Sequence, residues 1–314
     1  MIARPTVFIL GAGASAAYKF PAGLELTKRI CENVWNGNYL QGIAQEVSPH
    51  WEADARKLAD ELARATISID TWLSYRTDQE RNIGKYLIAK AIIEHENQAN
   101  FREAFVANSD WYAWLWQALL PSRSKKLAGL RENTDVTFIT FNYDRSLEQA
   151  LLVKAHNTFG EPIDRCGEVL AQFPVIHVHG QLGSLPGQAQ WNGHLKGMPE
   201  REYEPKCELK ATFAYARCIK VMGEDDGEKG EYAGARNALS QAERIHFLGF
   251  GYHDENLRRL RIKELKPKAT IYGTYMGIGQ SQREVLESNN NEFGWAINMK
   301  HGYQGVLEYF LNMV

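Results

Sequence analysis

Residues 6–16 read TVFILGAGASA. Its first five residues are β-branched or apolar, too few for a helix, and predict a strand buried on both faces. The GAGASA that follows fits the relaxed G-x-G-x-x-G/A fingerprint of a nucleotide-binding strand–turn–helix unit. In that unit Gly11 permits the tight turn, Gly13 lets a pyrophosphate approach the backbone, and Ala16 allows close packing. A plain glycine turn is the alternative interpretation.

Further short apolar runs resemble the first one, and most of them end next to Gly or Asn. They are Val136–Phe141, Val175–Val178, Ile245–Phe250 and Thr270–Tyr272. Helical patterns lie between them, for example Leu24–Trp35, Ser146–Lys154 and Tyr232–Ala242. Strands that alternate with helices predict an α/β fold, a Rossmann-like parallel sheet with helices on both faces.

The interval 36–133 breaks this alternation, because it shows amphipathic helical patterns and no convincing strand. Two apolar stripes illustrate it: Trp51, Ala55, Leu58, Leu62 and Ala65, then Trp111, Trp114, Leu115, Ala118 and Leu119. Stripes at helical spacing are typical of a core rather than of a ligand site. We therefore predict an inserted helical subdomain at 36–133, within a Rossmann-like NAD-binding core formed by 1–35 and 134–314. The charged, glycine-rich segment Gly223–Gly230 predicts an exposed loop.

The composition excludes several classes of protein. The chain has 314 residues, with 36 Lys plus Arg against 38 Asp plus Glu, so we expect no direct binding to nucleic acid. No apolar run approaches the roughly 18 residues of a membrane span. The amino terminus resembles a signal peptide superficially, but Pro5, Gly11 and Gly13 interrupt it. Its 4 cysteines form no CxxC pair, which predicts a cytoplasmic protein with free thiols and no bound metal.

Polar residues follow the second predicted strand. Asn142 and Asp144 come directly after Val136–Phe141. Ligands of open parallel sheets bind beyond the carboxyl ends of the strands, so both side chains are candidates for a site. Alternatively, either residue caps the helix that begins near Arg145, and Asp144 could do both.

The next two strand ends carry His and Gly residues. His177 and His179 share one face if the strand continues through both, but no recognisable third ligand accompanies them, so a metal pair is not expected. His179 is instead placed for general-base work near neutral pH, with a structural role as the alternative. After the fourth strand, Gly249 and Gly251 let a backbone come close to a ligand, and Asp254 is a candidate helix cap.

Together these four motifs resemble the sirtuin superfamily. The order is Gly-Ala-Gly-x-Ser, then Asn-x-Asp, His-Gly and finally Gly-x-Gly. The resemblance is closest to the sirtuin-like NAD hydrolase domains of prokaryotic antiphage defence systems. It covers residues 1–33 and 134–275 and leaves out the helical stretch.

Three departures from the sirtuin pattern matter. Protein-deacylating sirtuins carry four zinc-binding cysteines in two CxxC pairs, which this chain lacks. They have Gln before the catalytic Asn, where this chain has Phe141, and frequently Ser where it has Gly251. The first two departures argue against deacylation, the missing cysteines also argue against zinc, and the third departure leaves the contacts to the ribose or phosphate open.

The resemblance implies NAD⁺ as the substrate and cleavage of the nicotinamide–ribose bond to nicotinamide and ADP-ribose. Asn142 and His179 would then be catalytic: the first would hold water or ribose hydroxyls, and the second would act as base. The residues implied to bind NAD⁺ are Gly11, Ala12, Gly13 and Ser15 at the diphosphate, Asp144 at the nicotinamide amide, and Gly249 and Gly251 at the adenosine side.

Two alternatives to hydrolysis stay open: a non-catalytic module that binds NAD⁺ or ADP-ribose, and sirtuin-type ADP-ribosyl or acyl transfer. An enzyme that consumed NAD⁺ freely would poison its own cell. We therefore expect a regulated, NAD-depleting effector of antiphage defence that works as a homo-oligomer, with a second defence protein such as an ATPase or nuclease. The insertion at 36–133 is its expected contact surface.

Overall fold

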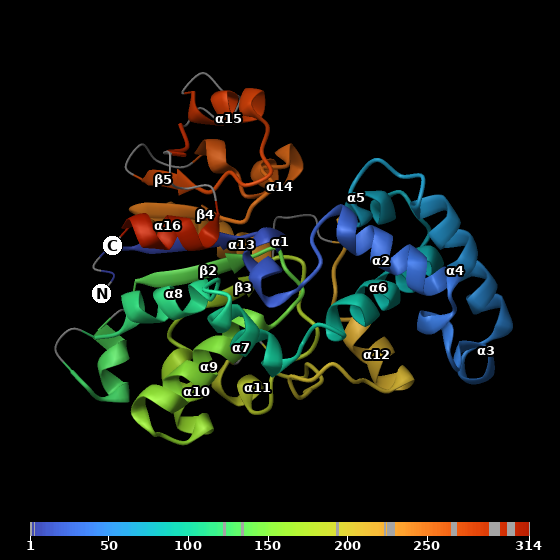
Figure 1. The fold of residues 1–314 in the computed structure, drawn as a ribbon, viewed down its shortest axis with the longest axis horizontal. Coiled ribbons are helices and arrows are strands. Elements are labelled where there is room, and N and C mark those ends of the chain that lie inside the picture. Colours follow the sequence, from blue (N-terminus) through green and yellow to red (C-terminus); the bar gives the residue numbers. More distant parts are fainter. Residues whose placement is uncertain are drawn as a thin grey trace.

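The structure is a computed structural model that describes residues 2, 4–121, 124–132, 135–192, 195–222, 224, 230–264, 269–288, 296–299 and 305–313. Five parallel strands form one sheet in the order β3-β2-β1-β4-β5 (Figure 1). The strands are β1 (Thr6–Leu10), β2 (Val136–Thr140), β3 (Val175–His177), β4 (Arg244–Leu248) and β5 (Thr270–Gly273). This is the Rossmann-like α/β fold predicted from the sequence, and its strand order reverses between β1 and β4.

The central strand β1 shows why these short runs form a sheet. All of its residues are buried, because helices cover both faces. Phe8 and Leu10 point to one face and pack against α8 (Trp111–Leu119), α9 (Ser146–Phe159), α10 (Ile163–Leu170) and α16 (Val306–Met313). Val7 and Ile9 point to the other face and pack against α13 (Gly230–Gln241) and α14 (Asp254–Arg259). We call these the α9 face and the α13 face.

A group of helices stands beside the sheet (Figure 1). It contains α2 (Leu24–Trp35), α3 (Ile43–Glu46), α4 (Pro49–Leu62), α5 (Ile69–Ser74), α6 (Asp78–Ile93) and α12 (Leu209–Ala216). Residues with hydroxyl side chains cap the N-termini of several of these helices. The Ser48 Oγ accepts from the Trp51 amide at the start of α4, and Thr77 forms a capping box with Glu80 at the start of α6. Ala55, Leu58 and Leu62 of α4 are buried, as their spacing predicts.

Shorter helices complete the chain. They are α1 (Ala12–Ser15), η1 (Ala16–Tyr18), η2 (Asn38–Leu40), α7 (Gln98–Val106), η3 (Leu127–Glu132), α11 (Gln188–Trp191), η5 (Ile262–Glu264) and α15 (Gln280–Glu287). In the part of the chain that the structure describes, no helix combines the length and the apolar composition that crossing a bilayer requires.

The segment predicted as an insertion divides between two places. Its described residues form no strand, and its helices α3 to α6 belong to the group beside the sheet. However, α8 packs on α9 and α16 over the sheet itself, while α12, from outside the segment, packs on α6. One continuous hydrophobic core joins the α9 face to this helical group. The predicted loop Gly223–Gly230 lies outside the described residues, except for Glu224 and for Gly230, which begins α13.

Candidate functional site

The turns after β1 and β4 press against each other where the strand order reverses. The Gly13 amide donates to the Gly249 carbonyl at 3.0 Å. A Cβ on Gly11 would lie 2.5 Å from the Gly249 oxygen, and one on Gly249, whose φ is +58°, would lie 2.1 Å from the Ala14 nitrogen. Only glycine fits these positions. The topological switch point, where ligands bind in open α/β sheets, is therefore built from two interlocked glycine turns.

Because of this packing, backbone amides of the first turn that were expected to face a phosphate already have partners within the protein. The Gly13 amide donates to the Gly249 carbonyl, and the Ala14 amide donates to the Gly11 carbonyl at 2.9 Å. Ala12 and Gly13 lie at the exposed edge of the turn. Gly251 is also exposed, and a Cβ there would meet only the His253 side chain, 3.1 Å away. A ligand would reach these residues from the solvent side of the two turns.

A buried polar cluster links the end of β1 to the end of β2. The Asn142 Nδ2 donates to the Gly11 carbonyl and to the Ser15 Oγ, both at 3.0 Å. The Ser15 Oγ donates in turn to the Asp144 Oδ2 at 2.9 Å. Ser15, Asn142 and Asp144 are all at most 8% exposed. The structure thus joins three predicted site residues in one chain of hydrogen bonds, with Ser15 in the middle.

Asp144 also serves the helix that follows it. Its Oδ1 accepts from the Ser146 amide at 3.0 Å, at the start of α9. Burial raises the pKa of the Asp144 carboxyl and the charge of Glu148 adds to this, although hydrogen bonds from Ser146 and Ser15 oppose the rise. A buried carboxyl with a raised pKa is typical of functional sites, and here it also caps a helix.

His179 lies at the next strand end but on the α13 face. Its ring is 5.4 Å from the Phe141 ring and 6.2 Å from the Tyr232 ring of α13, measured between centroids. The Tyr232 hydroxyl lies 3.5 Å from the His179 Nε2. The adjacent Gly180 has φ +72°, and a Cβ there would lie 2.0 Å from the Cys218 carbonyl oxygen. The rings of Phe141 and Tyr232 therefore hold His179, and close packing against the Cys218 backbone holds Gly180.

His177 and His179 do not share a face, which corrects the expectation from their spacing. The strand β3 ends at His177, and the chain then turns, with the Gly180 amide donating to the His177 carbonyl at 3.0 Å. His177 faces α9, where its Nε2 lies 2.8 Å from the Glu148 Oε1. In the described ranges, no group of three or more His, Cys, Asp or Glu side chains is arranged to hold a metal ion.

Several residues that support the site carried no sequence signal. The Trp111 Nε1 of α8 donates to the Ala14 carbonyl at 2.7 Å, and the hydroxyls of Tyr112 and Ser146 lie 2.7 Å apart. The stripe predicted as core is indeed buried at Trp111, but its indole also holds the first glycine turn. No local pattern relates α8 to a turn almost 100 residues earlier.

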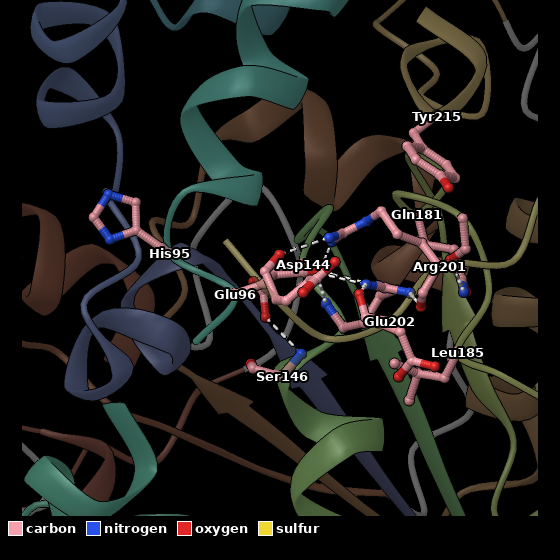
Figure 2. A network of polar contacts seen from close by, with 12 residues as sticks. His95, Glu96, Asp144, Ser146, Gln181, Leu185, Arg201, Glu202 and Tyr215 are labelled. Atoms are coloured by element: carbon pink, nitrogen blue, oxygen red, sulfur yellow. Dashed lines mark hydrogen bonds and ion pairs between the residues drawn. The ribbon is translucent and has the colours of Figure 1, made fainter. Parts of the chain in front are cut away.

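A buried charge cluster lies beside Asp144 (Figure 2). Glu96 forms ion pairs with both Arg145 and Arg201. The Arg145 Nη1 donates to the carbonyls of Ser184 and Arg201 at 2.9 and 2.8 Å. Burial lowers the pKa of Arg145 to about 10. Because Arg145 follows Asp144 directly, this cluster ties the Asn142–Ser146 turn to the end of α6.

A cavity of about 50 Å³ lies behind this site, between α9, α10 and α11. Its walls are mostly apolar, and Glu148 borders it. It lies on the α9 face, near the His177–Glu148 pair rather than at the glycine turns.

Comparison of this chain with protein-family models and with curated proteins finds no match.

Proposed function

We propose that this protein hydrolyses NAD⁺ at the nicotinamide–ribose bond. The observation that carries the proposal is the meeting of two glycine turns at the switch point of the sheet, next to the buried Ser15–Asn142–Asp144 cluster. This is the place where a Rossmann-like sheet takes a dinucleotide. The resemblance of the four motifs to sirtuin-like NAD hydrolases supports the same ligand.

The turns would hold the two ends of the dinucleotide in different ways. We assign the diphosphate to the first turn, where Ala12 and Gly13 are exposed. The Ser15 hydroxyl is buried and bonded to Asn142 and Asp144, so it would hold the turn in place. We assign the adenosine side of NAD⁺ to the second turn, where Gly251 is exposed next to His253. Gly11 and Gly249 act indirectly, because their missing side chains let the turns lie together.

The proposed reaction breaks the bond between the ribose C1′ and the nicotinamide N1 and uses one water. The bonding pair stays with the pyridine nitrogen, which becomes neutral, and the water oxygen forms the new bond to C1′. His179 would accept the proton that this water releases, directly or through a ribose hydroxyl. The products are nicotinamide, ADP-ribose and one proton.

Asn142 and Asp144 would position the reacting groups. The Asn142 amide is held toward the first turn by Gly11 and Ser15, a placement suited to holding water or ribose hydroxyls. Asp144, which is buried beside Asn142 and Ser15, would contact the carboxamide of nicotinamide. Groups that are pre-organised in a buried site need little rearrangement during the reaction, which is the main source of their catalytic effect.

We further propose that the enzyme is a controlled, NAD-depleting effector of antiphage defence in the cytoplasm. Control would come from homo-oligomer formation or from a second protein, such as an ATPase or nuclease, that contacts the helices of segment 36–133. The support for this is the resemblance, together with the cost to a cell of free NAD⁺ hydrolysis.

The test is to incubate the purified protein with NAD⁺ over a range of protein concentrations and to identify the products by mass. Equimolar nicotinamide and ADP-ribose support the proposal. Nicotinamide release with ADP-ribose bound to protein would indicate transfer instead. Stoichiometric binding without turnover would indicate a binding module. No binding and no turnover would refute an NAD⁺ site.

A further inference from the structure

His177 and Glu148 form a buried pair that the proposed reaction does not use. The His177 Nε2 lies 2.8 Å from the Glu148 Oε1, and its Nδ1 lies 2.9 Å from the carbonyl oxygen of Asn142. His177 is 5% and Glu148 9% exposed. One imidazole ring therefore connects helix α9 to the backbone of the proposed catalytic Asn142.

The partners of the ring define its protons. A carbonyl oxygen only accepts, so Nδ1 carries a proton and donates it to Asn142. Burial lowers the pKa of His177, but the charge of Glu148 and the hydrogen bonds outweigh this and leave the pKa raised. Burial raises the pKa of Glu148, and the charges of His177 and Arg145 reverse that. Both directions favour an imidazolium that donates from both nitrogens.

Stability does not explain this pair. A buried ion pair seldom stabilises a fold more than apolar side chains would. The second carboxylate oxygen of Glu148 is buried and has no hydrogen-bond partner among the described residues, and Glu148 borders the mostly apolar cavity of about 50 Å³. A polar group that is only half satisfied in such surroundings costs free energy.

What the pair does achieve is to fix the Asn142 peptide. The Asn142 amide donates to the Thr140 Oγ1 at 3.0 Å, and its carbonyl accepts from His177. The next carbonyl, of Tyr143, accepts from the Leu182 amide at 3.1 Å. Of these supports, the bond from His177 is the one that ties the Asn142 carbonyl to α9, the helix that Asp144 caps.

We propose that His177 is a positioning residue for NAD⁺ hydrolysis: its Nδ1 proton holds the Asn142 carbonyl, and Glu148 orients the ring through Nε2. This inference rests on the proposed function for its kinetic consequence. Displacing a catalytic group by about 1 Å is enough to slow a reaction by roughly a hundredfold, so the loss of this one bond should appear in kcat.

Two substitutions of His177 separate its two hydrogen bonds. In His177→Asn the amide nitrogen takes the place of Nδ1, so the bond to Asn142 stays and the contact with Glu148 is lost. In His177→Gln the amide nitrogen takes the place of Nε2, so the contact with Glu148 stays and the bond to Asn142 is lost. We expect H177N to keep kcat within about threefold of wild type, and H177Q to lose at least about tenfold with KM unchanged.

A second readout does not depend on activity. Hydrogen exchange followed by mass spectrometry should show peptides covering residues 141–146 exchanging at least about tenfold faster in H177Q, and near the wild-type rate in H177N. If H177Q does not fold, His177→Ala, which lacks both bonds, takes its place.

The outcomes separate the two proposals. Faster exchange and lower kcat in H177Q alone support the positioning role. Equal effects in H177N and H177Q, or no effect in either, would overturn it. If the wild-type protein releases no nicotinamide, the proposed hydrolysis fails, and the exchange rates alone still decide whether His177 holds the Asn142 turn.

Discussion

Replacing Gly249 by alanine tests the packing of the two glycine turns on which the site depends. Two costs add up at this position. The left-handed backbone, φ +58°, costs an alanine about 1–2 kcal/mol. Its Cβ, 2.1 Å from the Ala14 nitrogen, forces apart backbone atoms, an overpacking that costs roughly 1–3 kcal/mol. We expect Gly249→Ala to lower the free energy of unfolding by about 2–5 kcal/mol.

Two other glycines separate these costs. Gly160 ends α9 with φ +68° and nothing within 4 Å of an added Cβ, so Gly160→Ala should show the backbone cost alone, about 1–2 kcal/mol. Gly11 has φ −106° and a Cβ would lie 2.5 Å from the Gly249 oxygen. Gly11→Ala should therefore show the steric cost alone, about 1–3 kcal/mol.

Equilibrium unfolding in urea measures all three variants against wild type, with equal m-values as the sign of an unchanged two-state reaction. The expected order of loss is G249A greater than either G11A or G160A. If G249A loses no more free energy of unfolding than G160A, the two glycine turns do not pack against each other at the switch point.

Three further predictions concern charge and assembly. Because the pKa of Asp144 is raised in the folded state, this carboxyl stabilises the fold below its unfolded-state pKa of about 3.9, and its contribution to the free energy of unfolding is lost as pH rises through the folded-state pKa. Asp144→Asn removes this contribution, so in urea titrations at several pH values its free energy of unfolding should have a less negative slope with pH than that of wild type, and an unchanged slope would contradict this. Glu96→Gln leaves Arg145 and Arg201 without their shared buried carboxylate and should cost about 3–5 kcal/mol; a loss below about 1 kcal/mol would show that the cluster is not desolvated. Light scattering with activity measured across a concentration series should show activity rising with oligomer formation, whereas a monomer fully active at nanomolar concentration would refute control by assembly.

The regular elements were predictable because local patterns determine them. The strand Thr6–Leu10 and the helix Leu24–Trp35 have the predicted bounds, since an apolar run between breakers and an amphipathic stripe need no distant partner. Strand ends were less predictable. The fourth strand was expected to reach Phe250, but it ends at Leu248, because Gly249 takes up a left-handed conformation against the first turn.

The site was predictable only where topology brings strand ends together. Ser15, Asn142 and Asp144 were each singled out at a strand end, and they come together because parallel strands place their carboxyl ends on one edge. The pairing of His177 with Glu148 was missed, since the spacing argument assumed a strand that continued to His179. Trp111 and Glu96 were missed as well, because their contacts join segments that no local sequence pattern relates.

Nicotinamide release by variants of Asn142 and His179 tests whether these two side chains carry the proposed hydrolysis of NAD⁺. Nicotinamide release is quantified by mass for wild type, Asn142→Ala and His179→Ala under conditions where wild type is active. Asn157→Ala and His156→Ala, exposed residues of α9 outside segment 36–133, are matched controls, and circular dichroism confirms that each variant is folded. We predict a loss of at least about a hundredfold in N142A and in H179A, with both controls near wild type. Wild-type rates in N142A and H179A would show that these two side chains do not carry the reaction.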